Sequence, residues 1–140
     1  MFAGELALAA AAAFTGAAFY VSAVEHPARL PLAPGPLLQH WRPSYARATR
    51  MQGGLALAAT ALGLLAWGTS GDPRWLLGAL LAFANWPYTL AAIMPTNRVL
   101  GTIAPEDPRL RPLMLRWGRL HAVRNLLGAA ATVAFLWALH

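Results

Sequence analysis

A histidine and an arginine stand in a part of the chain that is otherwise apolar enough to cross a membrane. His121 and Arg124 follow Trp117 in the run Trp-Gly-Arg-Leu-His-Ala-Val-Arg. A charge inside hydrocarbon is costly, so an ionisable pair at such a position predicts a functional site. An imidazole can serve as a general base near neutral pH, and a guanidinium can bind oxygen atoms that carry negative charge. We therefore expect both side chains to be catalytic.

Helical geometry places this pair on one stripe of the last apolar segment. At about 100° per residue, Trp117, His121 and Arg124 fall within roughly 80° of one another. Arg124 would lie about 10 Å inside the helix, where it must reach back to the interface or pair with an acid. Glu25 is the one acid near the inner end of an apolar segment. We expect a Glu25–Arg124 ion pair and count Glu25 among the catalytic residues. The alternative is that the pair only holds the first helix against the fourth and has a structural role.

Further polar residues fall at the same end of the expected helices. Asn85 would lie roughly 13 Å deep in the third helix, and an asparagine at that depth needs hydrogen-bond partners inside a bundle. The residues that we expect to bind substrate at this end are Asn85, Tyr88, Asn97, Trp117 and Gln52.

Composition indicates a polytopic membrane protein. The chain has 140 residues, of which 58% are hydrophobic and 11% are charged, against about 25% charged residues in a soluble domain. Cysteine is absent, which excludes disulfides and thiolate chemistry. The net charge of +6 comes from arginines between the apolar segments. That is how membrane topology is encoded, so we expect no nucleic-acid partner.

The expected fold is all-α: a four-transmembrane-helix up-down bundle formed by residues 1–140 as a single integral membrane domain. The helices are predicted at about 3–24, 51–69, 75–94 and 115–139, each near the 20 residues that a span needs. Five prolines between residues 27 and 43 predict a long Pro-rich first loop that cannot form one regular helix. No repeat of fixed period is evident.

The arginines also predict an orientation. Nine of them flank the first and third loops, against Arg74 alone in the second. By the positive-inside rule, the first and third loops face the cytoplasm and both termini lie outside it. We expect a multi-pass protein of the inner (plasma) membrane, with its polar site on the cytoplasmic side, membrane lipid and a small lipophilic substrate as partners, and a homo-oligomer as one possible assembly.

Three short runs resemble the anthrone oxygenase-like family of small four-helix integral membrane proteins, most of whose bacterial members are uncharacterised. These runs are Asn85-Trp-Pro-Tyr-Thr, Met94-Pro-Thr-Asn-Arg-Val-Leu and Trp117-Gly-Arg-Leu-His-Ala-Val-Arg. The resemblance covers essentially the whole chain. It implies oxidation of an anthrone methylene to a quinone by dioxygen, without a familiar organic cofactor.

Several functions remain open at this point. One is a cofactor-free oxygenase in which His121 is the base, acting on a phenolic or quinone-like substrate. Another is a metal-dependent oxidase with His26, His121 and Glu25 as ligands, the two-histidine, one-carboxylate set of non-haem iron enzymes. The adjacent Glu25 and His26 would point about 100° apart on a helix, which weakens the metal hypothesis. A non-enzymatic amphiphile binder, a transporter and an accessory membrane subunit also fit the residue pattern.

Overall fold

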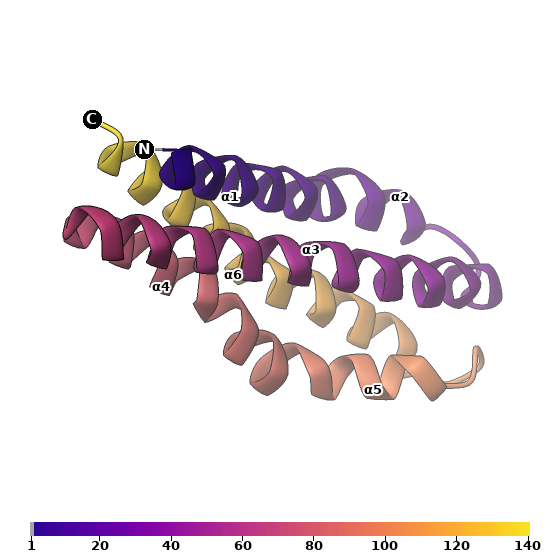
Figure 1. Ribbon diagram of the computed structural model, residues 1–140. Helices are drawn as coiled ribbons and strands as arrows, with labels where there is room; N and C mark the ends of the chain where they lie inside the picture. Colours follow the sequence, from indigo (N-terminus) through magenta and orange to yellow (C-terminus); the bar gives the residue numbers. More distant parts are fainter. Residues whose placement is uncertain (1) are drawn as a thin grey trace.

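The computed structural model describes residues 2–140, and within that range every regular element is a helix (Figure 1). Four of these helices are long and apolar enough to cross a membrane. The all-α, four-helix prediction is confirmed. Their parts are α1 (Phe2–Tyr20) with the π-helical turn η1 (Val21–Glu25) and α2 (His26–Arg29); α3 (Pro34–Ser70); α4 (Pro73–Tyr88) with the π-helical turn η2 (Thr89–Ile93) and α5 (Met94–Thr102); and α6 (Leu110–Ala138).

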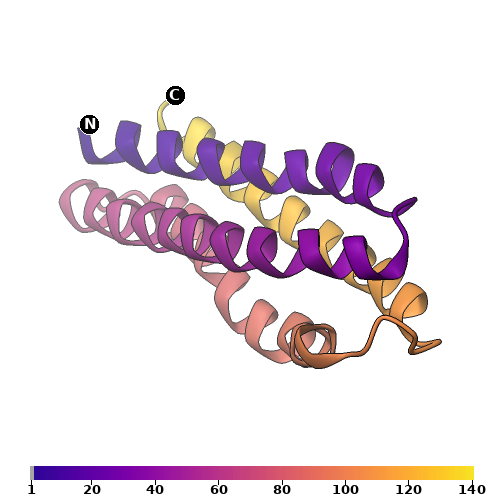
Figure 2. The ribbon, with the colours of Figure 1, turned by 90° about the vertical axis from the view of Figure 1, so that its right-hand side faces the viewer.

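The four helices run up and down. Figure 1 and Figure 2 show both termini at one end of the bundle, together with the turn from α3 to α4. The turn from α2 to α3 and the loop from α5 to α6 lie at the opposite end. At the turn into α4, Asp72 accepts a hydrogen bond from the backbone N–H of Arg74 (2.9 Å). Hydrogen bonds from Arg74 lower the pKa of the Asp72 carboxyl.

The helices extend well past the predicted ends, and the prediction of a long Pro-rich first loop is wrong. Only residues 30–33 separate α2 from α3. Pro34 and Pro36 lie in the first turn of α3, where a missing N–H costs nothing. Pro27 and Pro95 each follow a π-helical turn that contains the carbonyl four residues before the proline. The wider turn relieves the clash between that carbonyl and the proline ring, so the helix continues.

The two halves of the chain repeat one pattern with unequal spacing. Pro27 and Pro95 stand at the same distance behind η1 and η2. In the following helices, Pro36-Leu-Leu-x2-Trp41-x3-Tyr-Ala matches Pro112-Leu-Met-x2-Trp117-x3-His-Ala. The rings of Trp41 and Trp117 meet edge to face with their centroids 6.0 Å apart. Each half is thus a helical hairpin, and equivalent tryptophans join the two. The unequal loops hide the repeat from a search for one fixed period.

The third membrane-length helix, formed by α4, η2 and α5, bends at η2, so that α5 diverges from α3 (Figures 1 and 2). A buried cluster holds α5 against the start of α6. It includes Leu100, Leu110 and Met114, none more than 1% exposed. Within it, the indole N–H of Trp117 donates to Asn97 Oδ1 at 2.9 Å. This hydrogen bond fixes the rotation of a large ring around which the polar residues gather.

A double-mutant cycle tests that bond. Asn97→Ala and Trp117→Phe each leave one buried polar group unpaired, which costs roughly 1–3 kcal/mol. The double variant has no orphaned group at this bond, so its loss should be smaller than the sum by about 0.5–3 kcal/mol. Unfolding of the purified protein in detergent measures all four forms. Strictly additive losses would show that the bond does not hold α5 to α6.

Candidate functional site

The imidazole of His121 is held in one tautomer. The side chain is 9% exposed, and its Nδ1 lies 2.9 Å from the backbone oxygen of Trp117. A carbonyl oxygen only accepts, so Nδ1 carries the hydrogen and Nε2 keeps its lone pair. The ring also lies against the indole of Trp117, with centroids 3.8 Å apart. His121 therefore offers a positioned proton acceptor.

Arg124 is buried without a carboxylate. It is 5% exposed, and its guanidinium carbon lies 5.3 Å from the centre of the Phe14 ring. None of the three ion pairs among residues 2–140 includes Arg124, and its Nε has no hydrogen-bond partner there. The expected Glu25–Arg124 pair is therefore wrong. A buried cation that lies against an aromatic face and has no carboxylate partner among residues 2–140 can still donate hydrogen bonds to a bound anion.

Glu25 is engaged elsewhere. Its carboxylate accepts hydrogen bonds from the Arg29 guanidinium and the Ser44 hydroxyl. Arg29 is 2% exposed and stands one turn after Glu25, because α2 continues past Pro27. The sequence prediction ended the first helix at Val24 and so assigned Arg29 to a loop. The i, i+4 spacing of Glu25 and Arg29 is the signal that identifies this pair.

The expected substrate-binding residues divide into two groups. Tyr88 donates from its hydroxyl to the Leu120 carbonyl (2.8 Å), and Asn97 accepts from Trp117, so both act within the protein. Asn85 is 2% exposed and donates from Nδ2 to the Ala82 carbonyl (3.2 Å). Its Oδ1 has no partner among residues 2–140. Asn85 thus keeps an acceptor free inside the bundle.

Gln52 connects two hollows around the pair. It lines a small pocket together with His121, Arg124 and Trp117. It also lines a groove of about 390 Å³ between the first helix and α3, whose walls include Tyr20 and Arg47. A volume near 390 Å³ is within the range of small-molecule sites, about 300–1,000 Å³. Since Val21 and Ala48 are likewise shared by both hollows, the groove opens beside His121.

The candidate metal ligands are not brought together. His26 is 5% exposed and contacts Trp117, with ring centroids 5.0 Å apart. A Cβ added to Gly118 would lie only 2.8 Å from Nε2 of His26. The absence of a side chain at Gly118 therefore leaves room for the imidazole ring. The Glu25 carboxylate is bonded to Arg29 and Ser44. Among residues 2–140, no three His, Cys, Asp or Glu side chains form a group that could hold a metal ion.

Some residues of the site are absent from the sequence prediction. Phe14 and Arg29 are buried beside Arg124 and Trp117, respectively. Thr49 lines the small pocket. Trp86, by contrast, belongs to a run that the sequence analysis singled out; it lines a second pocket and donates from its indole to the Gly53 carbonyl (3.3 Å). Phe14 lies on the first helix and Thr49 on the unpredicted start of α3. The sequence does not show that either residue lies near Arg124, because that proximity depends on how the helices pack.

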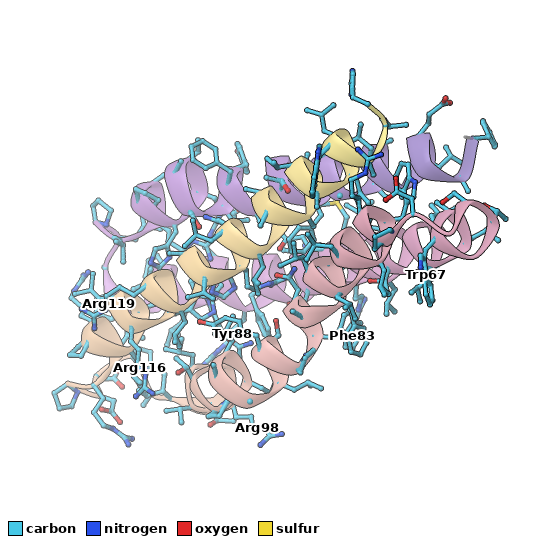
Figure 3. All side chains as sticks on the ribbon, turned by 90° about the vertical axis from the view of Figure 1, so that its left-hand side faces the viewer. Trp67, Phe83, Tyr88, Arg98, Arg116 and Arg119 are labelled. Carbon is cyan, nitrogen blue, oxygen red and sulfur yellow. The ribbon has the colours of Figure 1, made fainter. Side chains whose placement is uncertain are left out.

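The polar site lies toward the arginine-rich end of the bundle. Figure 3 shows Arg98, Arg116 and Arg119 at that end and Trp67 at the other, with Tyr88 between them. All three arginines are exposed. The outer surface of the helices between the ends is apolar, with Leu80 and Leu126 exposed by 55% and 71%.

Comparison with known proteins identifies the family of this chain. Residues 41–134 match the family described as Anthrone oxygenase. An "Anthrone oxygenase" from Claviceps purpurea (strain 20.1) is 28% identical over 144 aligned residues, covering 91% of this chain and 83% of the relative. "Anthrone oxygenase tpcL" from Aspergillus fumigatus is 31% identical over 108 residues, covering 69% and 66%. No solved structure matches. The chain belongs to the anthrone oxygenase family, which supports a function of the oxygenase type.

Proposed function

We propose that the protein is a membrane-embedded oxygenase that oxidises an acidic methylene carbon of a planar, lipophilic, phenolic ketone of the anthrone type to a carbonyl. The observation that carries the proposal is the placement of Arg124. This buried cation has no carboxylate partner among residues 2–140 and lines the same small pocket as His121, whose Nδ1 is bonded to the Trp117 carbonyl. A base and an oxyanion binder in one pocket are what enolate formation requires.

The first step is removal of a proton from the substrate carbon. The proton moves to Nε2 of His121, and the electron pair of the C–H bond delocalises onto the ketone oxygen. Arg124 donates to that oxygen, which lowers the free energy of the enolate. The imidazolium and the guanidinium would repel each other in an empty pocket, and the enolate between them offsets that repulsion.

The second step consumes dioxygen. The carbanion carbon transfers electrons to dioxygen and bonds to one of its atoms, which gives a hydroperoxide after protonation. Loss of water from the hydroperoxide leaves a carbonyl. For anthrone the balance is C14H10O + O2 → C14H8O2 + H2O, so the substrate supplies all the electrons, and dioxygen supplies the oxygen of the new carbonyl and that of the water.

The groove beside the first helix is the place for the body of the substrate. Its volume of about 390 Å³ suits a fused ring system. Tyr20 and Met51 give it apolar walls, and Gln52 offers a polar contact where the groove meets the His121 pocket. Asn97 and Trp117 hold His121 in position and do not themselves bind the reacting oxygen. The arginine-rich end faces the cytoplasm, and both termini lie outside.

Replacing the base should remove most of the activity. His121→Ala should lower the rate of dioxygen-dependent conversion of anthrone to anthraquinone by about 100-fold, measured with purified protein and corrected for autoxidation of anthrone. His40→Ala replaces an exposed histidine and should behave as the wild type. Full activity of folded His121→Ala protein would exclude His121 as the base.

Replacing the oxyanion binder should act on turnover. Arg124→Gln should lower kcat by roughly 100- to 1,000-fold, the effect of losing a preorganised donor to a developing oxyanion. Arg124→Lys keeps the charge without the planar fork, so its kcat should fall between those of Arg124→Gln and the wild type. Arg119→Gln, an exposed position on the same helix, is the matched control. An unchanged kcat in Arg124→Gln would contradict the assignment.

The orientation is testable because the chain has no cysteine of its own. His140→Cys and Ala104→Cys each introduce one exposed thiol, at the two opposite ends of the bundle. A membrane-impermeant maleimide should label residue 140 on intact cells and residue 104 only after permeabilisation. The reverse pattern would place the site on the outer side.

A further inference from the structure

A second pocket lies beside Arg124, at the bend between α4 and α5. Its volume is about 60 Å³, and it lies between α3 and the segment from α4 to α5. Most of its wall is apolar, formed by Gly53, Ala56, Leu90 and Met94. Arg124 lines both this pocket and the one that His121 lines, so one arginine borders both spaces.

The size and lining of this pocket define what it can hold. The volume of about 60 Å³ is more than the roughly 10–15 Å³ that a water molecule needs and well below the roughly 150 Å³ of an apolar cavity that binds benzene, so the pocket suits a very small molecule. Apolar cavities of proteins bind xenon and other small apolar species. Leu90 is 55% exposed on the outer surface, so the pocket borders the lipid, in which dioxygen is more soluble than in water.

We propose that this pocket holds dioxygen for the reaction. This proposal rests on the proposed function. It adds a binding site for dioxygen that is separate from the site of the organic substrate. The organic substrate comes from the groove between the first helix and α3, dioxygen comes from the pocket at the bend, and the two meet at Arg124. Separate spaces let each substrate bind without displacing the other.

The polar end of the pocket suits reduced dioxygen. Arg124 Nε and Asn85 Oδ1 are both buried and have no hydrogen-bond partner among residues 2–140. As electrons pass from the carbanion to dioxygen, negative charge develops next to the guanidinium, which stabilises it. Once the distal oxygen is protonated, its O–H can donate to Asn85 Oδ1. The neutral gas meets an apolar wall, and its reduced form meets a donor and an acceptor.

The chain offers a matched pair of glycines for the test. A Cβ on Gly53 would lie 3.4 Å from Cζ2 of Trp86, an ordinary contact, so Gly53→Ala should fold and place a methyl group against this pocket. A Cβ on the neighbouring Gly54 meets nothing within 4 Å. Both changes give the same gain in helix propensity, so Gly54→Ala controls for it. Gly53→Val fills more of the space.

Kinetics with varied dioxygen is the first measurement. Gly53→Ala should raise KM for dioxygen roughly fivefold or more, as expected for crowding a filled site, and Gly53→Val should raise it further. KM for anthrone should not change, and Gly54→Ala should match the wild type in both. An unchanged KM for dioxygen in folded Gly53→Val protein, or equal increases for both substrates, would overturn the dioxygen site.

Xenon supplies a readout that does not depend on activity. Crystals of the wild type under xenon pressure should show an atom between Gly53 and Leu90, and crystals of Gly53→Val should not. Ordered water between Asn85 and Arg124, without xenon, would overturn the proposal. A wild type that does not oxidise anthrone with dioxygen would instead refute the proposed function, and the gas site as a substrate site with it.

Discussion

The hydrogen bond from the Trp117 indole to Asn97 fixes the ring around which the polar residues at the arginine-rich end of the bundle gather. The indole it fixes is the common neighbour of Trp41, Arg29 and both histidines of the site. Because the backbone oxygen of Trp117 also holds His121 Nδ1, one residue sets both the position and the tautomer of the proposed base. The backbone carbonyl of Trp117 therefore takes the place that a carboxylate has in many histidine-based sites, and the indole ring lies against the imidazole.

Two buried arginines carry different tasks. Arg29 is bonded to Glu25 one turn away and lies over Trp117 at 5.8 Å, so its charge is compensated inside the protein. Arg124 has an aromatic face and, within residues 2–140, no acid. A buried charge costs free energy unless something compensates it. In the described part of the chain Arg29 has a carboxylate partner and Arg124 has none, and this difference supports the proposed role of Arg124 in binding.

Residue pattern alone predicts much of this molecule and fails at definable places. The four apolar runs, the stripe of Trp117, His121 and Arg124, and the shared end of the polar groups all follow from helical periodicity. Helix ends do not, because a proline normally stops a helix. Here a π-helical turn before Pro27 and another before Pro95 allow the helix to continue past each proline. The wrong end at Val24 led directly to the wrong partner for Arg124, since Arg29 was left out of the helix.

The repeated hairpin has a further consequence for how such a protein can change. Trp41 and Trp117 hold matching places, yet the residue four positions later is Tyr45 in one hairpin and His121 in the other. One copy of the motif thus carries the proposed base, while the other supplies a neighbouring wall, as Tyr45 does in the small pocket. A chain with two copies of one scaffold can alter its chemistry in one copy and its substrate selection in the other, and each can vary without undoing the other.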